Sequence, residues 1–414
     1  MHDTTTLPID AVRFVKELYP RLREDPAAIE RYRDAIDQLP PIIVARDGVL
    51  VDGFHRWQAH RQERRTEIAV ENLGNLSDAE IFTESIRRNA THGHQLSRKD
   101  KENLAGKLWH SLGHLSNAER TTEIASMLAV SERSVQSWTK DARKYEKEQQ
   151  QAAAWDAWLD CRTQQDIAGE IGVDQKTISN WLGERADSRI FLDPPASQQH
   201  FDVWSFQTAA GESTYFGKMP PQVVENLLWL YTDPGDVVLD PFAGGGTTID
   251  VAKSMGRRVW SSDRKPSTPT LPIHTHDITT GWPDAAPSKV KFVLLDPPYW
   301  RQAAGRYSDD PEDLGNMTLE DFLSAWESTV KACADHLVAD GKLAFIVSPA
   351  ENEDHSVTDL AIEMYQVCVD TGLTPHRRII VPYNTQQATG QQVTWARENK
   401  LLLKLYRDLV VFRP

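Results

Sequence analysis

The spacing of apolar residues changes along the chain, and these changes divide the chain into four regions. Residues 1–75 contain short apolar runs at 42–44 and 49–51 around a glycine turn, and they predict a small α/β domain. Residues 76–182 have few strand-like runs and predict an all-helical region. Residues 183–215 contain several Pro, Ser and Gln residues and predict a connecting segment.

The fourth region, residues 216–414, alternates apolar runs with helical patterns. Examples of the runs are Val-Val-Leu at 237–239 and Phe-Val-Leu-Leu at 292–295. This alternation is typical of a mostly parallel sheet covered by helices, so we expect an α/β catalytic-sized domain here.

A sequence pattern occurs twice in the helical region, 43 positions apart. Residues 122–131 (TEIASMLAVS) match residues 165–174 (QDIAGEIGVD). Each copy predicts a short amphipathic helix, a tight turn, and a second helix capped by Ser131 or Asp174. This is the pattern of a helix-turn-helix, whose second helix enters the DNA major groove.

The second helices of these two units carry side chains suited to phosphates and base edges. The candidate DNA-binding residues are Arg133, Gln136, Lys176 and Asn180. The alternative is a pair of ordinary helical hairpins, in which the repeated Ile, Val and Trp positions form a core. Duplication with both caps retained favours DNA binding.

A glycine-rich segment, PGDVVLDPFAGGGTT at 234–248, predicts a strand, a loop and a helix that begins near Thr247. Glycines let the backbone approach a ligand closely, and a helix start offers N–H groups. The motifs of dinucleotide and P-loop sites are both missing from this segment. Asp240 at the strand end suits an amino group, and Asp263, which ends the next predicted strand, suits ribose hydroxyls.

A second segment, KFVLLDPPYW at 291–300, predicts a buried strand that ends in Asp-Pro-Pro-Tyr. The Asp296 carboxylate and the Pro297 carbonyl can accept both hydrogens of an exocyclic amine, which favours a tetrahedral nitrogen with an available lone pair. Pro298 helps to fix that carbonyl, and Tyr299 offers a face on which a flipped-out base can stack. This chemistry requires no metal, and we predict none.

Through these motifs the sequence resembles the amino-methylating DNA methyltransferase family over roughly residues 205–414. That family carries a D-P-F-x-G-x-G-T-T motif and a D/N/S-P-P-Y/F motif. The resemblance implies a Rossmann-like fold, S-adenosylmethionine as cofactor and double-stranded DNA as partner. It extends upstream to residues 216–221 and downstream to Tyr307, residues 313–316 and the terminal strand at 408–412. The implied cofactor-binding residues are Phe216, Lys218, Asp240, Phe242, Gly244, Gly246, Thr247, Asp263 and, near the adenine ring, Asp277.

The same resemblance favours adenine N6 as the modified atom, because the family's cytosine-N4 enzymes usually carry Ser at the position of Asp296. Cytosine N4 stays an alternative. Methylation of RNA or of protein glutamine is another, although those sites favour Asn at that position. A DNA-binding partition or regulatory protein with an idle methyltransferase fold is the alternative from a different class.

A second Asp-Pro-Pro at 193–195 is followed by Ala196, which cannot stack on a base, so we assign it to the connecting segment. The chosen motif order places Asp296 only 48 positions after Thr248, too close for an inserted recognition domain. Target recognition is then expected from residues 376–399, which include Arg377, Arg378, Asn384 and Arg397, or from the N-terminal half.

The N-terminal segment 48–59 (GVLVDGFHRWQA) predicts a strand, a glycine turn and a helix start that carries His55 and Arg56. It resembles the ParB/sulfiredoxin-like domain, which implies a nucleotide phosphate bound at this turn by backbone N–H groups and these two side chains. The turn has no cysteine, which excludes sulfiredoxin chemistry. The alternative is that His55 and Arg56 satisfy local carboxylates.

Charge refines this picture. The net charge is −14, yet residues 84–147 hold 12 Lys/Arg against 8 Asp/Glu, a local balance of +4. Phosphate binding depends on the residues in contact, so the global acidity does not exclude DNA. The three cysteines are far apart, and neither a membrane-length apolar run nor an export signal is evident, so we expect a cytoplasmic protein.

Overall fold

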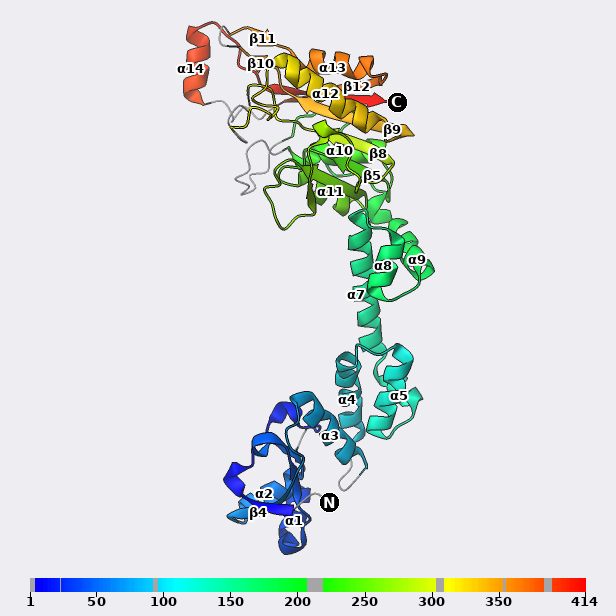
Figure 1. Ribbon diagram of the computed structural model, residues 1–414, viewed down its shortest axis with the longest axis vertical. Coiled ribbons are helices and arrows are strands. Elements are labelled where there is room, and N and C mark those ends of the chain that lie inside the picture. Colours follow the sequence, from blue (N-terminus) through cyan, green and yellow to red (C-terminus); the bar gives the residue numbers. More distant parts are fainter. Residues whose placement is uncertain are drawn as a thin grey trace. The chain divides into compact units, whose positions relative to one another are not determined.

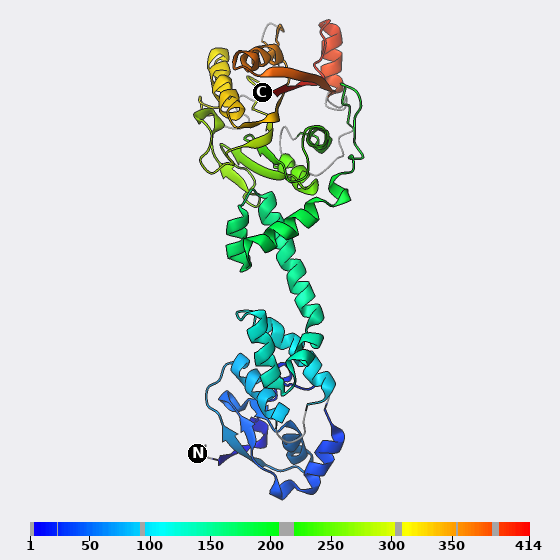
Figure 2. The same ribbon diagram turned by 90° about the vertical axis from the view of Figure 1, so that its right-hand side faces the viewer.

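The computed structural model describes residues 4–22, 24–91, 96–206, 219–302, 309–352, 355–382 and 389–414 (Figures 1 and 2). The chain forms two compact units, Met1–Gln149 and Gln150–Pro414. The division falls inside helix α7 (Lys140–Leu159), within the predicted helical region and not at one of its ends.

The first unit begins with a four-stranded sheet in the order β1-β4-β2-β3. Its strands are β1 (Thr4–Pro8), β2 (Ile42–Val44), β3 (Leu50–Asp52) and β4 (Glu67–Asn72). Its helices are α1 (Pro26–Asp34) and α2 (Phe54–Gln62), followed by α3 (Asp78–Thr91), α4 (Arg98–Ser111), α5 (Asn117–Leu128) and α6 (Glu132–Trp138). Phe54 and Trp57 of α2 pack with Ile42 and Val44 of the sheet.

Helices α5 and α6 form the first helix-turn-helix unit. The Ser116 hydroxyl and the Glu119 carboxylate make a capping box at the start of α5. Helix α5 ends at Ala129 in the left-handed conformation, and Ser131 caps α6 by accepting from the Ser134 N–H. Ile124 and Val135 are fully buried in a core shared with α3 and α4.

The second helix-turn-helix unit belongs to the second compact unit and consists of α8 (Gln164–Ile171) and α9 (Gln175–Ala186). Gly172 ends α8 with a φ of 78°, and the Asp174 carboxylate caps α9 by accepting from the Thr177 N–H. Trp155 of α7 packs with Ile167 and Ile178 of this pair.

A seven-stranded sheet forms the centre of the second unit, in the order β12-β13-β9-β8-β5-β6-β7. Its strands are β5 (Val237–Asp240), β6 (Arg258–Asp263), β7 (Ile273–Thr275), β8 (Val290–Leu295), β9 (Leu337–Val347), β12 (Thr374–Pro382) and β13 (Tyr406–Arg413). β13 is antiparallel to both of its neighbours, whereas β9, β8, β5, β6 and β7 are parallel to one another. This confirms the predicted mostly parallel sheet.

Helices cover both faces of this sheet (Figure 1). Helices α10 (Pro221–Tyr231) and α11 (Thr247–Ser254) cover one face, and α12 (Leu319–Ala334) and α13 (Leu360–Asp370) cover the other. In β8, Phe292 and Leu294 face α10 while Val293 and Leu295 face α12, as the period of two in a strand requires. A short hairpin, β10 (Ala350–Glu351) with β11 (Val357–Thr358), and helix α14 (Gly390–Glu398) complete the unit.

The described part of the predicted connecting segment belongs to the second unit and is hydrogen-bonded to α10 and β12. The Gln199 N–H donates to the Asn226 side-chain oxygen over 2.7 Å, and the Trp204 N–H donates to the Ile380 carbonyl over 2.8 Å. Asp193 of the second Asp-Pro-Pro lies in an exposed turn and not at the end of a strand.

Candidate active site

A cavity of about 270 Å³ opens at the carboxyl ends of the parallel strands. Asp240 ends β5, Asp263 ends β6, Asp296 follows β8, and all three line this cavity. β5 lies between β6 and β8, so the chain runs outward from β5 in both directions. Such a reversal of strand order is the place where open α/β sheets bind ligands.

The glycine loop forms one wall of the cavity. Gly244 has a φ of 47°, and Gly246, with a φ of 81°, is the residue directly before α11. Glycine suits position 246 because of its positive φ, and a Cβ atom there would also displace the end of the Leu271 side chain. Phe242, Gly244 and Thr247 line the cavity, whereas Gly246 shapes the turn beside it.

Asp240 is the most buried carboxylate of the site, with 5% of its surface exposed. Its oxygens accept from the Phe242 N–H over 3.0 Å and from the Thr248 side chain. Burial, with a smaller contribution from the nearby Asp296 carboxylate, raises the pKa of Asp240 to about 7. A buried carboxylate in this state would be stabilised by a positively charged ligand group.

Asp263 is fixed by two backbone donors. Its carboxylate accepts from the Gly244 N–H over 3.0 Å and from the Lys265 N–H over 2.8 Å. A carboxylate has about four acceptor positions. The remaining ones can accept from the hydroxyls of a ribose.

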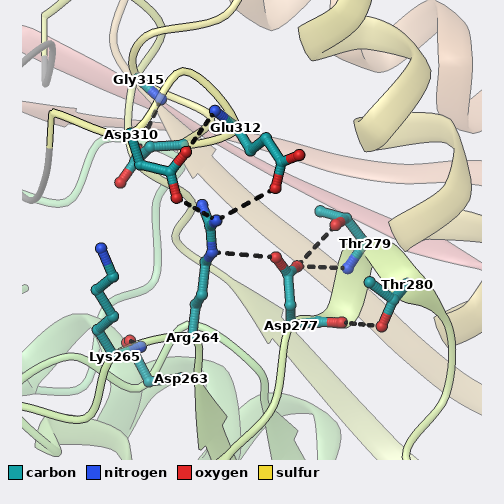
Figure 3. A network of polar contacts seen from close by, with 10 residues as sticks. Asp263, Arg264, Lys265, Asp277, Thr279, Thr280, Asp310, Glu312 and Gly315 are labelled. Atoms are coloured by element: carbon teal, nitrogen blue, oxygen red, sulfur yellow. Dashed lines mark hydrogen bonds and ion pairs between the residues drawn. The ribbon is translucent and has the colours of Figure 1, made fainter.

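Arg264 links Asp277 to the turn that follows the Asp-Pro-Pro-Tyr motif (Figure 3). Its Nε lies 3.4 Å from Asp277 Oδ2, and its Nη2 lies 2.6 Å from Asp310 Oδ2 and 3.7 Å from Glu312 Oε2. The other Asp277 oxygen accepts from the Thr279 N–H over 3.0 Å. The network thus holds two walls of the cavity together.

Our sequence reasoning missed Arg264, Asp310 and Glu312. The available signals were the cation directly after Asp263 and the acidic run DDPED at 309–313. Neither signal indicates that these groups meet.

Asp296 lines the same cavity as the glycine loop. Burial raises its pKa to about 6, against the opposing effects of the Arg407 charge and of a hydrogen bond from the Tyr299 side chain. Pro298 also lines the cavity, Pro297 is buried, and Tyr299 is half-buried against the core under α12. Asp296 therefore reaches the ligand space, and Tyr299 holds its carboxylate.

Some predicted residues lie outside the described ranges. These are Phe216 and Lys218 of the cofactor set, together with Tyr307 and Asn384.

The predicted nucleotide residues line a second cavity, of about 250 Å³, in the first unit. His55 is buried, and its Nε2 accepts from the Asp25 N–H over 3.1 Å. The Arg56 guanidinium donates to the Pro41 carbonyl over 2.7 Å and to the Asp52 carboxylate over 2.8 Å. These bonds hold the turn together, and a nucleotide there stays a prediction.

The four candidate DNA-binding side chains are exposed on the second helices of their units. Arg133 and Gln136 lie on α6 in the first unit, and Lys176 and Asn180 lie on α9 in the second. Within the described ranges, no His, Cys, Asp and Glu side chains gather as a metal site, and no helix is both long and apolar enough to cross a membrane.

Comparison with known proteins places the chain in a family. The model of a family described as DNA methylase matches residues 60–268, half of the chain, and this match includes the glycine loop but ends before Asp296. The type II methyltransferase M.BglII of Bacillus subtilis is 26% identical over 111 residues, which cover 20% of this chain and 31% of that protein. The chain thus spans about a third of the length of this curated relative.

Two solved structures illustrate the structural matches. TrmN from Thermus thermophilus is 17% identical with a TM-score of 0.33, covering 48% of this chain and 50% of that one. ParB from Caulobacter crescentus, complexed with CTP-gamma-S, is 19% identical with a TM-score of 0.20, covering 33% and 76%. Scores this low support no argument about function. The family match over half of the sequence does decide membership, and the chain belongs to the N6/N4 DNA methylase family.

Proposed function

We propose that the chain transfers a methyl group from S-adenosylmethionine to the exocyclic amine of a base in DNA, and that the base is adenine. The supporting observation is that Asp296 and the glycine loop line a single cavity at the point where the strand order reverses. Asp193, the alternative start of an Asp-Pro-Pro motif, lies in an exposed turn.

The cavity residues fit this cofactor. Asp240 would pair with the ammonium group, Asp263 with the ribose hydroxyls, and Asp277 would lie near the adenine ring. S-adenosylmethionine, when bound, supplies an electrophilic methyl group on a positively charged sulfur. The cavity is lined by more acidic than basic side chains, so its potential favours a cationic ligand. The carboxylates are Asp240, Asp263, Asp277, Asp296, Glu312 and Asp313, against Arg264 and Lys265.

Asp296 and Pro297 would orient the amine. The carboxylate and the carbonyl oxygen each accept one amine hydrogen, which leaves the nitrogen lone pair directed away from both acceptors. Accepting with a carboxylate gives a stronger hydrogen bond than accepting with a neutral group. The Tyr299 hydroxyl fixes the carboxylate, and its ring is the proposed stacking surface for the flipped base.

The choice of adenine rests on Asp296 and on the base itself. A two-ring base offers Tyr299 more area for stacking than a one-ring base. The family resemblance adds that Asp at this position is typical of adenine enzymes.

The test compares Asp296→Ala with Asp193→Ala in the full chain, expressed in a strain without DNA methylation. We expect Asp296→Ala to bind S-adenosylmethionine, measured by calorimetry, but to lose methyl transfer by about 100-fold or more. Asp193→Ala should keep both properties.

Digesting the methylated DNA to nucleosides and measuring them by mass spectrometry identifies the base. N4-methylcytosine without N6-methyladenine would reverse the base assignment. Equal turnover by Asp296→Ala and the wild type would overturn the site itself.

A further inference from the structure

Helix α14 projects from the rest of its unit (Figures 1 and 2). Its start is fixed by a capping box between Thr389 and Gln392. Ala396 is buried, whereas Gln391 and Arg397 are exposed and Trp395 exposes 40% of its surface. The helix is therefore well formed and presents most of its side chains outward.

The coil after α14 is tied to the catalytic segment through one carbonyl. Lys404 Nζ donates to the Pro349 carbonyl over 2.7 Å, and the Gln302 side-chain amide donates to the same carbonyl over 2.6 Å. Gln302 is three residues after Tyr299. The coil after α14 therefore lies next to the proposed base-binding edge of the cavity.

The same coil carries an unusual apolar side chain. Leu402 exposes 96% of its surface, the largest value among the exposed large hydrophobic residues that the structure describes. Over residues 389–404 the charged side chains are Arg397, Lys400 and Lys404 against Glu398, a balance of +2 in a chain of −14. A basic, outward-facing segment complements a phosphate backbone.

From these observations we propose that residues 389–404, which we name the α14 segment, dock on duplex DNA beside the target base, and that Leu402 enters the space the flipped base leaves. The inference rests on the proposed function, because only chemistry on a flipped base creates such a space. Proteins that distort a duplex commonly insert an apolar side chain between base steps, leucine among them.

The partner is DNA and not a second copy of the chain because of charge and position. The α14 segment is basic while the chain as a whole is acidic, and the hydrogen bonds at Pro349 make the segment continuous with the catalytic edge. Arg397 and Lys400 would contact phosphates on either side of the extruded base.

The first experiment uses Leu402→Ala in the full chain, with Ile190→Ala as the matched control. Ile190 exposes 74% of its surface and lies directly before Phe191, whose ring approaches Gly256 at the opposite edge of the sheet. Substrates are two duplexes built on the sequence that the wild type methylates, one fully paired and one with a mismatch at the target base. Unstacking and unpairing cost a few kcal/mol, and less for a mismatched base.

We expect Leu402→Ala to methylate the paired duplex about 10-fold more slowly and the mismatched duplex at nearly the wild-type rate. Ile190→Ala should match the wild type on both. Equal rates of Leu402→Ala and wild type on the paired duplex would overturn the wedge role. So would an equal loss on both duplexes, because a merely structural defect does not depend on base pairing.

The second experiment measures binding of a labelled random-sequence duplex at several salt concentrations. Arg397→Ala should lower the slope of log affinity against log salt by about one, as expected for one lost phosphate contact. Lys331→Ala on α12, also exposed, is the control. An unchanged slope for Arg397→Ala would overturn docking, and so would a shift in oligomeric state without a change in slope. If the wild type binds DNA with this dependence on Arg397 but transfers no methyl group, the proposed function fails while docking stands.

Discussion

The two ends of the parallel strands in the seven-stranded sheet have different environments. We call the side with the carboxyl ends of these strands the carboxyl edge and the opposite side the amino edge. At the carboxyl edge, Asp240 and Asp296 are held in surroundings that raise the pKa of each above its ordinary value. At the amino edge, aromatic side chains and ion pairs close the structure. The Trp158 ring lies against Gly235, and Lys253 forms an ion pair with Asp160 over 2.6 Å.

The second helix-turn-helix unit is part of this amino edge. The Arg258 guanidinium donates to the Trp158 carbonyl over 3.1 Å, and Arg257 donates to the Phe191 carbonyl over 2.9 Å. Both arginines stand at the beginning of β6, at the end of the strand opposite Asp263. The carboxyl edge therefore carries the carboxylates of the cavity, and the amino edge is bonded to the second helix-turn-helix unit and the residues around it.

The largest expected effect comes from a substitution in the helical region next to the amino edge. Trp155 is 3% exposed and stacks on Phe191 with ring centroids 5.5 Å apart. Trp155→Ala should lower the free energy of unfolding of the second unit by about 3–5 kcal/mol, the usual cost of truncating a buried aromatic side chain. Denaturant unfolding measures it. Trp395→Ala, on exposed α14, is the control and should cost far less; equal losses would show that the module does not stabilise the sheet.

The second prediction changes a carboxylate at the carboxyl edge and expects opposite effects on cofactor binding and on stability. Asp240→Asn should weaken S-adenosylmethionine binding by about 10- to 100-fold, because a hydrogen bond to a charged group is worth roughly 1.5–3 kcal/mol. The same change should raise the melting temperature at pH 8. The pKa of Asp240 is raised on folding, so the ionised carboxylate disfavours the folded state, and the loss of stability is complete above about pH 7.

Calorimetry and thermal unfolding measure the two effects of Asp240→Asn. Asp236 stands directly before β5, and its carboxylate accepts from the Asp233 N–H over 2.8 Å. Asp236→Asn is therefore a control at the other end of the same strand and should leave cofactor affinity unchanged. A fall in melting temperature for Asp240→Asn at pH 8 would contradict the account of the carboxyl edge.

The third prediction concerns pH. The pKa of Asp296 is raised to about 6, and a protonated carboxyl group loses the acceptor strength that the amine requires. Below pH 6 the turnover number should fall about tenfold per pH unit and level off above it, as for one essential ionised group. The Arg407 charge lowers this pKa, so Arg407→Met should move the fall to higher pH, while Arg407→Lys should restore it. If the pH profile of the turnover number is the same for Arg407→Met and the wild type, Arg407 has no influence on the pKa of Asp296.

The contrast between the edges also explains how much the sequence could predict. The positions of Asp240, Asp263 and Asp296 at or directly after strand ends could be predicted, because each belongs to a local pattern, an apolar strand followed by a loop. Their roles at the site stay predictions. The Arg264 network was not predicted, since Arg264 and Asp310 are 46 positions apart and no spacing links them. The bond between Arg258 and Trp158 spans 100 positions.

The two helix-turn-helix copies show the same limit. Their caps, turns and buried apolar positions were predictable because they repeat locally. Their assignment to different compact units, which divide between Gln149 and Gln150, was not predictable, because packing between segments distant in sequence decides this division.

The smallest expected effect compares these two copies as DNA readers. Residues 96–149, around the first copy, hold 10 Lys/Arg against 8 Asp/Glu, whereas residues 150–191, around the second, hold 4 against 7. Arg133 and Lys176 occupy equivalent positions, each two residues after its cap. The acidic surroundings of Lys176 should repel phosphates and weaken any contact that it makes.

Arg133→Ala should therefore weaken duplex binding by about 3- to 10-fold and lower the salt slope by about one, while Lys176→Ala should change affinity less than twofold. Fluorescence anisotropy with a random-sequence duplex at salt concentrations from roughly 50 to 200 mM gives both values, because affinity that depends on phosphate contacts falls steeply over this range. A double variant that adds Lys176→Ala to Arg133→Ala should behave like Arg133→Ala alone. An equal loss of affinity from either single change would instead mean that both copies bind DNA. The second copy would then have a binding role in addition to its contacts at the amino edge.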